Sequence, residues 1–323
     1  MLNLALLEGI RLHRRPRAQR WLADGFLRFD YRKVDLVVEG LARIPAHPVI
    51  YAMNHTDNFS YWPFQYTLHR RFQRYTATWV KGKNFEQPAV STFMRMTNNI
   101  PLASRGYLIS RDFASTLGRR PEEQEYRRLR DALDAPERPA GGFPAALLET
   151  PRDILGRRFE PSRETYFEAL DALYARMSER FVELNERAMG LGLDVLVYPQ
   201  GSRSVRLSSG HIGIAEIALH LGATIVPVGC SNGDLIYPSR SPFARPGRIV
   251  YRVGEPISPS EQRRFAPPGP FIPLSRDAER EHRPRFQALV DLIMQRIDGL
   301  VDERHRYGGD LQSDGSQGME RFL

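Results

Sequence analysis

Short apolar runs alternate with helix-like stretches from about Val34 to Ile257, and this alternation constrains the fold more than any other feature of the chain. Helices are expected over Tyr61 to Arg74, Glu86 to Met96 and Ile212 to Leu221. Between them, runs rich in Val, Ile and Tyr end in Gly, Asn or Pro, which predicts strands: VDLVVEG, PVIYAMN, YTATWVKG, DVLVYPQG, ATIVPVGCS and RIVYRVGEP. Several runs are apolar on consecutive residues, as in strands buried on both faces. The repetition predicts an α/β fold with a mostly parallel central sheet flanked by helices.

A stretch from about residue 112 to residue 186 interrupts this alternation, and no good strand is expected in it. Its first half is charged and then rich in Pro, Ala and Gly. Its second half has apolar side chains at three- and four-residue spacing, which predicts an amphipathic helix from about Arg163 to Met189 that Gly190 ends. We interpret residues 112–186 as a helical insertion over the sheet, either a lid or membrane-facing cap, or a packed subdomain without direct chemistry. A C-terminal amphipathic helix is expected at about residues 284–307.

Residues 1–32 predict an amphipathic helical segment in which Leu, Trp and Phe alternate with Arg. Pro16 is expected to break it into two pieces, because proline lacks the amide hydrogen that a helix interior needs. Two interpretations remain open for this segment. It lies in a membrane interface, with apolar side chains among the acyl chains and arginines at phosphate level, or it packs on its own domain, which comprises residues 33–323.

The chain carries 46 Lys and Arg residues against 38 Asp and Glu, a net charge of +8. A positive surface attracts nucleic acid or anionic lipid. Because the sequence has no zinc-finger spacing and no clear aromatic RNA-binding motif, we expect no nucleic-acid partner. A single Cys excludes an internal disulfide framework and fits a reducing compartment. No apolar run approaches the roughly 20 residues of a membrane span, so the charge favours an anionic membrane surface as partner.

The segment MNHTDNFSYWP places His55 directly after a predicted strand. Polar turns at the carboxyl ends of parallel strands are where α/β proteins hold ligands. Histidine is the side chain best suited to take a proton near neutral pH, and Asp57 and Ser60 are close enough in sequence to orient its ring. In the alternative interpretation, Thr56 or Asp57 caps the helix that begins near Phe59, and His55 is a turn residue.

A second polar turn follows the strand in VLVYPQGSRS. Gly201 lets the backbone approach a ligand closely. Ser202, Arg203 and Ser204 supply two hydroxyls and a guanidinium, a set suited to phosphate. Arg105, after the short apolar run in NNIPLAS, is a second candidate anion contact. Lys81 also follows a strand, but a surface role is the default interpretation for it. We find no metal-ligand cluster, P-loop or dinucleotide fingerprint.

The order of these pieces resembles the glycerolipid acyltransferase family, of the lysophosphatidic acid (1-acylglycerol-3-phosphate) acyltransferase type. That family is marked by N-H-x4-D, an Arg-containing block, F-P-E-G-T-R-S and an I-V-P-V block. The resemblance covers roughly Lys33 to Ser258, less the insertion. The matching residues, in chain order, are Asn54 and His55; Ile100, Pro101 and Arg105; Tyr198, Pro199, Gly201, Ser202, Arg203 and Ser204; and Ile225, Val226, Pro227 and Val228.

The resemblance implies a glycerol-3-phosphate acyltransferase-like fold, with residues 33–323 as the acyltransferase domain. It implies that His55 deprotonates a hydroxyl of a lysophospholipid or glycerol phosphate, which attacks the thioester of acyl-CoA or acyl carrier protein. Arg105 and Arg203, with the turn from Gln200 through Gly201 and Ser202, would hold the acceptor. No metal or other cofactor is implied. The expected location is the cytoplasmic face of a membrane, as a peripheral protein in phospholipid biosynthesis.

Two positions depart from the family pattern: the aspartate of N-H-x4-D falls on Ser60, and the glutamate of the third block is Gln200. Serine adds no negative charge, so it raises imidazole basicity less than aspartate does. Asp57 is a nearby carboxylate that could substitute. Two functions therefore stay open, an active acyltransferase and a weakened or inactive relative that binds lipid or acyl carrier.

Overall fold

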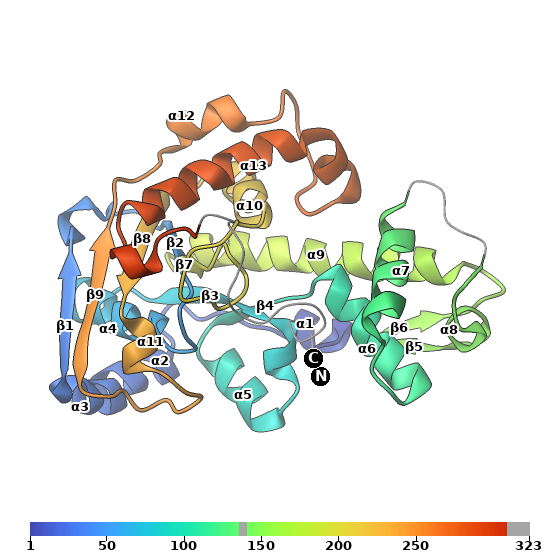
Figure 1. Cartoon of the computed structure of the whole chain (residues 1–323), viewed down its shortest axis with the longest axis horizontal. Coiled ribbons are helices and arrows are strands. Elements are labelled where there is room, and N and C mark those ends of the chain that lie inside the picture. Colours follow the sequence, from blue (N-terminus) through green and yellow to red (C-terminus); the bar gives the residue numbers. More distant parts are fainter. Residues whose placement is uncertain (136–140, 309–323) are drawn as a thin grey trace.

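The computed structural model describes residues 1–135 and 141–308. A seven-stranded sheet crosses its centre in the order β1–β9–β8–β2–β7–β3–β4 (Figure 1). Strands β8, β2, β7, β3 and β4 are parallel, whereas β9 is antiparallel to β8 and β1 is parallel to β9. The bounds are β1 (Val34–Glu39), β2 (Ile50–Met53), β3 (Thr76–Lys81), β4 (Asn99–Leu102), β7 (Asp194–Val197), β8 (Ile225–Ser231) and β9 (Gly247–Val253). The predicted α/β fold with a mostly parallel sheet is confirmed.

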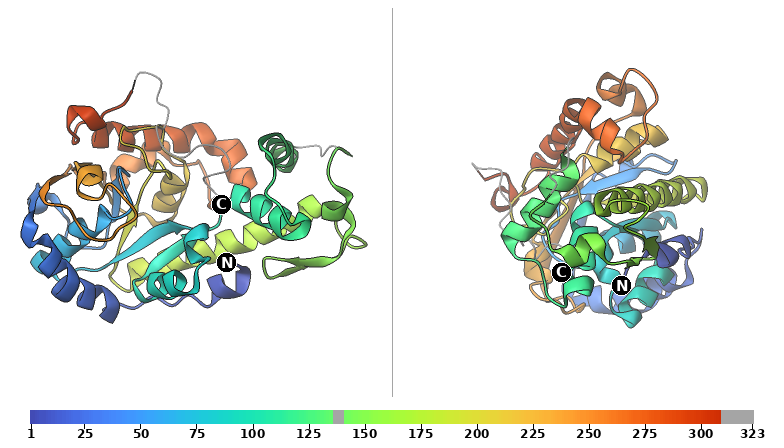
Figure 2. Two further views of the ribbon diagram at one scale, coloured as in Figure 1. Left: turned by 60° about the horizontal axis from the view of Figure 1, so that its bottom comes forward. Right: turned by 90° about the vertical axis from the view of Figure 1, so that its right-hand side faces the viewer.

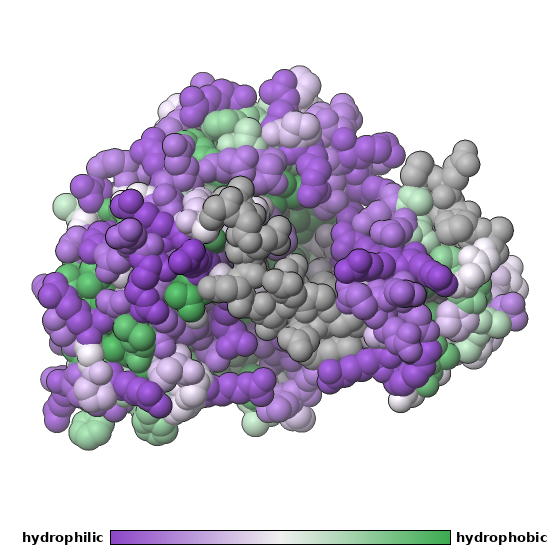
Figure 3. Space-filling view, in the orientation of Figure 1, coloured by the Kyte–Doolittle hydropathy of each residue, from purple (hydrophilic) through white to green (hydrophobic). Residues whose placement is uncertain are grey.

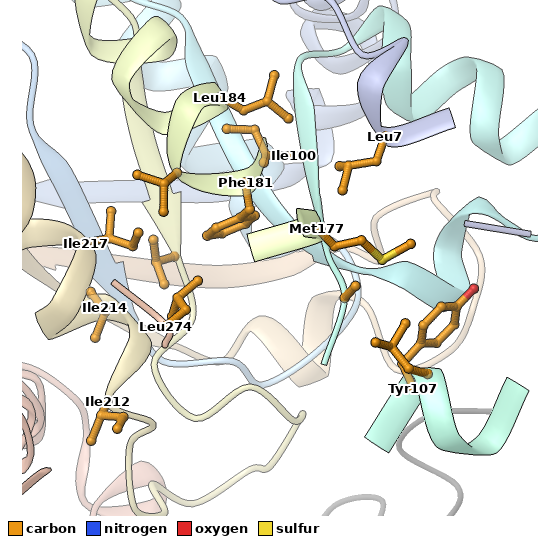
Figure 4. Close-up of a cluster of buried hydrophobic side chains, with 14 of the residues drawn as sticks. Leu7, Ile100, Tyr107, Met177, Phe181, Leu184, Ile212, Ile214, Ile217 and Leu274 are labelled. Carbon is orange, nitrogen blue, oxygen red and sulfur yellow. The ribbon is translucent and has the colours of Figure 1, made fainter. Parts of the chain in front are cut away.

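Helices cover both faces of the sheet, which explains why its strands are apolar on consecutive residues. In β2, Ile50 and Ala52 join a core with α9, α10 and α13, whereas Tyr51 and Met53 join a second core with α4 and the N-terminal helices. Figure 4 shows part of the first core, with Phe181 from α9 near the side chains of α10. The bounds of these helices are α4 (Tyr61–Phe72), α9 (Tyr166–Gly190), α10 (Gly213–Leu221) and α13 (Arg276–Asp298); α5 (Pro88–Met96) follows β3.

The region between β4 and β7 differs from the expectation in two ways. It contains a small antiparallel hairpin, β5 (Arg152–Ile154) and β6 (Arg157–Phe159), where no strand was expected. Its turn residues Leu155 and Gly156 both have positive φ, a backbone that closes a two-residue hairpin. The hairpin extends the molecule beyond the β4 edge, together with α6 (Arg105–Leu117), α7 (Glu123–Asp134) and α8 (Ala145–Glu149), rather than lying over the sheet (Figure 2).

Helix α9 forms the second half of that region and belongs to the core. Thr165 caps its first turn and Glu168 returns the hydrogen bond, a reciprocal capping box. The helix packs against β4 and β7, and Phe181 and Leu184 are buried in the first core. The predicted long amphipathic helix is therefore present, and it connects the outer elements to the sheet.

The N-terminal segment packs on the sheet as a broken helix. Helix α1 (Leu4–Glu8) is separated from α2 (Arg17–Trp21) by a stretch that ends at Pro16, as predicted, and a π-helical turn (Leu22–Leu27) leads into α3 (Arg28–Asp30). Leu2, Leu7, Ile10 and Leu12 are almost completely buried in the first core. This favours internal packing for the apolar residues of α1 and its flanks. No helix within residues 1–135 and 141–308 is both long and apolar enough to cross a membrane.

The C-terminal helix starts and ends earlier than expected. Helix α13 begins at Arg276, where the Ser275 side chain caps its first turn, and ends at Asp298. Pro284 therefore lies inside the helix, not at its start. Because Pro284 is exposed, the carbonyl that loses its helical hydrogen bond faces water. A short 3-10 turn (Glu303–His305) follows; the smaller helices α11 (Gly233–Ile236) and α12 (Pro259–Gln262) flank β8 and β9.

Candidate active site

His55 follows the last residues of β2, at the edge of the sheet where all five parallel strands end. We call this the carboxyl edge. The His55 amide donates to Gln200 Oε1 at 3.2 Å, and its carbonyl accepts from the Ser204 amide at 2.8 Å. The imidazole stacks on the Tyr198 ring with centroids 4.0 Å apart. The two polar turns predicted from the sequence therefore meet, and the second holds the backbone and ring of the first.

The imidazole of His55 has an unusual environment. Its Nδ1 atom is buried and has no hydrogen-bond partner. Burial lowers the pKa of His55 to about 3, and the positive charges of Lys81 and Arg203 contribute in the same direction. The ring is therefore neutral at physiological pH, in the state that can accept a proton.

Asp57 does not serve as the partner of His55 in this structure. Its Oδ1 accepts from the amides of Phe59 and Ser60, each at 2.7 Å, and its Oδ2 accepts from the Thr56 hydroxyl at 2.8 Å. These are the bonds of an Asx turn that leads into α4. Both amides precede Tyr61, the first residue of α4, and the N-cap residue Ser60 makes no side-chain cap hydrogen bond. Asp57 therefore stabilises the turn before the helix, and the helix cap expected from Thr56 or Asp57 is not formed. Burial raises the pKa of Asp57 to about 6.

Ser60 is likewise directed elsewhere. Its hydroxyl lies 3.4 Å from the Tyr198 hydroxyl and its carbonyl accepts from the Tyr251 hydroxyl. The residue is completely buried. Neither Asp57 nor Ser60 therefore forms the expected hydrogen bond to the His55 ring. Nδ1 lacks the partner that the family aspartate would supply.

Asn54, which precedes His55, fixes the end of β2 to the end of β8. Its Nδ2 donates to the Cys230 carbonyl at 2.8 Å, and its Oδ1 accepts from the Cys230 amide at 2.7 Å. An asparagine side chain pairs with a peptide group in this way because it offers one donor and one acceptor in the same geometry. Asn54 therefore positions the turn, while His55 faces the site.

Gln200 and Gly201 have different roles in the turn after β7. Gln200 is buried and links the turn of His55 to the loop after β7. Its Oε1 accepts from the His55 amide, and its Nε2 donates to the Arg206 carbonyl at 3.3 Å and to the Ser208 hydroxyl at 3.2 Å. Gly201 has φ of 65°, and a Cβ there would lie 2.8 Å from the His211 ring, so glycine is required. The amide of Gln200 thus replaces the family glutamate as a structural bridge without charge.

Lys81 is the residue that sequence reasoning undervalued. It is the last residue of β3, and β7 lies between β3 and β2 in the sheet. Two strand spacings therefore separate the end of β3 from the end of β2, a distance of about 10 Å. Its Nζ donates to the Ser202 hydroxyl at 3.1 Å. Together with exposed Arg203 it makes the site beside His55 positive. The signal was present in the sequence, because Lys81 follows a predicted strand whose carboxyl end lies at the same edge as His55.

Arg105 differs most from its expected role. It is 7% exposed, its Nη1 donates to Glu279 Oε2 at 2.8 Å, and its guanidinium lies 4.5 Å from the centroid of the Tyr174 ring. Asp134 lies 3.8 Å away. Strand β4, which precedes Arg105, is three strands from β2. Arg105 therefore ties α6 to α13 and is not available as a phosphate ligand, because a buried guanidinium needs the carboxylates it already has.

A comparison with protein families supports the resemblance seen in the sequence. Residues 35–129, which include His55 and Arg105, match the family described as Acyltransferase. The chain is also similar to a crystal structure of the 1-acyl-sn-glycerophosphate (LPA) acyltransferase PlsC from Thermotoga maritima, at 15% sequence identity and a TM-score of 0.45, over 92% of this chain and 85% of that chain. No curated protein sequence matches the chain significantly.

Within residues 1–135 and 141–308, no three His, Cys, Asp or Glu residues are grouped closely enough to hold a metal ion. The side chains that meet at the carboxyl edge are the neutral imidazole of His55, the cations of Lys81 and Arg203, and the hydroxyl of Ser202.

Proposed function

We propose that this protein is an acyltransferase, which moves a fatty acyl group from a thioester, acyl-CoA or acyl carrier protein, to a hydroxyl of a lysophospholipid or glycerol phosphate in phospholipid biosynthesis. The observation that carries the proposal is the neutral imidazole of His55 beside Lys81 and Arg203. A neutral imidazole accepts a proton from a hydroxyl, and the two cations attract an acceptor that bears a phosphate. The four sequence blocks in family order support the same assignment.

The reaction balances with the side chains present. His55 takes the proton of the acceptor hydroxyl while its oxygen attacks the thioester carbonyl, and the new C–O bond moves an electron pair onto the carbonyl oxygen. The tetrahedral intermediate then breaks its C–S bond. The departing thiolate takes the proton from the His55 imidazolium, which leaves an ester and a free thiol.

Binding of the acceptor is expected to activate the base. Lys81 and Arg203 lower the pKa of His55 in the empty site. A bound phosphate places negative charge between these cations and offsets their field, so the pKa of His55 rises when the acceptor is in place. The imidazole thus becomes more basic in the complex that reacts.

We also propose that the protein is peripheral, at the cytoplasmic face of a membrane, where an amphipathic acceptor resides. Three aromatic side chains are largely exposed: Trp21 at 70%, Phe29 at 72% and Phe243 at 61%. Phe26 links two of these regions, since its ring lies 5.4 Å from that of Phe243 and it shares the helical segment of Trp21. Exposed arginines stand among them, at positions 17, 20, 28, 240 and 245. Hydrophobic areas among hydrophilic ones are visible over α3 and α11 in Figure 3. Aromatic rings next to arginines are suited to an anionic interface.

The proposal is tested by acyl transfer to lysophosphatidic acid from several thioester donors, with wild type and His55→Ala. We expect His55→Ala to lose about 10²–10⁴-fold in turnover, because a positioned base contributes that much. His220→Ala is the matched control, since His220 pairs with Glu186 at 2.9 Å on the outside of α10. Wild-type turnover in His55→Ala would refute the assignment of the base.

The second candidate function is a relative that binds lipid or acyl carrier with little or no turnover. The specific observation that favours it is the unpartnered Nδ1 of His55, together with Ser60 in place of the family aspartate. Absence of transfer with every donor and acceptor, in a folded protein that still binds lysophosphatidic acid, would establish this alternative.

A further inference from the structure

The side chain of Tyr198 lies against the imidazole of His55 and has no role in the chemistry proposed above. The centroids of the two rings are 4.0 Å apart, and their planes are inclined by only 17°, so the phenol ring covers one face of the imidazole. Tyr198 directly follows β7, which pairs with β2, the strand that leads to His55. The contact therefore results from the adjacency of two strand ends in the folded sheet.

The imidazole needs this contact, because hydrogen bonds at Nδ1 do not set its orientation. Nδ1 has no partner among the described residues. The bonds of His55 to Gln200 and Ser204 hold its main chain and leave the torsion of the ring free. That torsion is broad in histidine when no neighbour restricts it. The face of Tyr198 therefore limits the rotation of the base.

Tyr198 is itself held on several sides. Its ring packs on the second core, and its carbonyl accepts from the Gly201 amide at 3.0 Å. Its hydroxyl lies 3.4 Å from that of Ser60, which is completely buried. A side chain positions its neighbour well only when packing and hydrogen bonds restrict its own rotamer. Tyr198 meets this condition at its backbone, its ring and its hydroxyl.

The charge that develops on His55 during proton transfer gives the contact a second effect. The positive charges of Lys81 and Arg203 lower the pKa of His55 and so oppose the imidazolium. The carboxylate of Asp57 bonds to the amides of its own turn and not to the ring. The face of an aromatic ring attracts a cation within about 6 Å of its centroid. The face of Tyr198 can therefore offset part of this repulsion.

We propose that Tyr198 is the positioning residue of His55, whose ring orients the imidazole for proton transfer and whose face stabilises the imidazolium that forms. This inference rests on the proposed function, because it concerns the base of that reaction. Tyr198 takes up and releases no proton itself, since burial raises the pKa of its hydroxyl well above the ordinary value. Ser60 acts through Tyr198, because its hydroxyl lies beside that of the phenol.

The contact is measured first, without turnover, by NMR of the full chain labelled with carbon-13 at the Cε1 atoms of histidine. His55→Ala identifies the signal of His55. The ring current of the aromatic side chain should shift that signal upfield in wild type and in Tyr198→Phe. In Tyr198→Leu the upfield shift should disappear. The same His55 signal in Tyr198→Leu as in wild type would overturn the inference.

Turnover of the same variants then tests the positioning role. Tyr198→Leu should lower kcat about tenfold, the effect of a lost cation–π contact at a partly desolvated site, and leave the KM of the acceptor unchanged. Tyr198→Phe retains the aromatic face and should stay within about twofold of wild type. Wild-type kcat in Tyr198→Leu, or a loss confined to KM, would refute the role. Equal losses in both variants would assign the effect to the hydroxyl and also refute it.

Tyr66→Leu is the matched control for the loss of a half-buried tyrosine. Tyr66 packs on the same second core, and its ring contacts Tyr31, at a centroid distance of 5.4 Å. This variant should lower Tm and keep the kcat of wild type. A fall in kcat equal to that of Tyr198→Leu would show that any weakening of the core slows transfer, and would overturn the inference.

Fluorinated phenylalanines at position 198 separate the electrostatics of the face from its shape, and they serve if Tyr198→Leu fails to fold. Fluorine withdraws negative charge from the face of the ring and changes the size of the ring little. The kcat should therefore fall stepwise from phenylalanine to the monofluoro and then the trifluoro residue. A merely structural role predicts equal kcat across this series, and that result would overturn the inference.

Failure of the proposed function gives a different pattern. Wild type would transfer no acyl group from any donor, while the NMR signal of His55 would still depend on Tyr198. That result would remove the positioning role together with the reaction. Failure of the inference alone leaves transfer in wild type and makes it independent of the side chain at position 198.

Discussion

The imidazole of His55 combines a buried nitrogen that has no partner with two cations nearby, and this combination determines its behaviour. Most buried polar atoms are hydrogen-bonded, so Nδ1 is an exception that points to a function or to a missing ligand. Ser60 cannot compensate, because its hydroxyl lies beside Tyr198. The base is therefore held by its backbone and by stacking, and its proton affinity depends on the charge that a substrate brings.

The pH dependence of kcat/KM tests this interpretation of His55. Because its pKa is lowered to about 3, activity of the free enzyme should stay level as pH falls from 8 to 5 instead of dropping near 6.5. Lys81→Met removes one cation, so the pKa should rise and the acid limb should move to higher pH. Comparing both enzymes on one acceptor cancels the titration of the acceptor's phosphate. A limb near 6.5 in wild type would contradict the lowered pKa.

The stability of the protein against pH tests the role of Asp57. Its folded pKa of about 6 lies above the ordinary value of 3.8, so its contribution is most favourable at low pH and is lost as pH rises through 6. Asp57→Asn keeps an acceptor for the Phe59 and Ser60 amides and removes this loss. Relative to wild type, its free energy of unfolding should be more positive at pH 8 than at pH 4 by about 3 kcal/mol, measured by denaturant unfolding at both pH values. Its turnover should remain close to wild type, because Asp57 does not contact His55.

At the scale of elements, long-range ion pairs hold the outer helices to the core. Arg105 at the start of α6 bonds to Glu279 of α13, near Glu216 of α10. Burial and the charge of Glu279 raise the pKa of Glu216 to about 8, so this carboxyl is protonated at neutral pH. The neutral state of Glu216 and the positive charge of Arg105 on Glu279 together allow the two carboxyl groups to lie close together between these helices.

Replacing Arg105 should therefore destabilise the fold without weakening acceptor binding. Arg105→Ala leaves the half-buried carboxylate of Glu279 beside Glu216 without its cation, which should cost about 3 kcal/mol, the lower end of the cost of breaking a buried pair. Glu279→Gln in the same chain should recover part of the loss. In contrast, Arg203→Ala should raise the KM of the acceptor with little change in Tm, because Arg203 is exposed. Thermal unfolding and steady-state kinetics separate the two effects. A raised KM in Arg105→Ala at unchanged stability would restore it as a substrate ligand.

Over the whole molecule, the exposed aromatic side chains and the arginines between them belong to the N-terminal helices and the segment before β9. Phe29 precedes β1 and Phe243 precedes β9, and both strands begin at the carboxyl edge, because β9 is antiparallel to β8. A membrane that contacted these side chains would lie at the same edge as His55. This arrangement would bring an amphipathic acceptor close to the base.

Binding to lipid vesicles tests that arrangement. A triple variant with Trp21→Ser, Phe29→Ser and Phe243→Ser should bind anionic vesicles more weakly, and wild-type binding should fall with salt, since each basic residue near the surface contributes about 1 kcal/mol. Phe72→Ser is the matched control, because Phe72 is also exposed but ends α4 away from the carboxyl edge. Removing residues 1–21 is not equivalent, because Leu2 and Leu7 belong to the core. Unchanged binding in the triple variant would exclude this surface.

What the sequence determined by itself was the local order of the fold and the location of its chemistry. Apolar runs with β-branched residues predicted β1, β2, β3, β7, β8 and β9, but not β4 or the hairpin of β5 and β6. Three- and four-residue spacing predicted α9, and the polar ends of β2 and β7 identified the candidate turns, since these signals act over a few residues. The tertiary structure decided the hydrogen-bond and ion-pair partners of the candidate site residues. Arg105 meets Glu279 and Lys81 meets Ser202 across 174 and 121 positions, and Asp57 bonds to its own turn. Such pairings depend on which strand ends adjoin in the folded sheet and on which buried charges require neutralisation, and no local pattern records either.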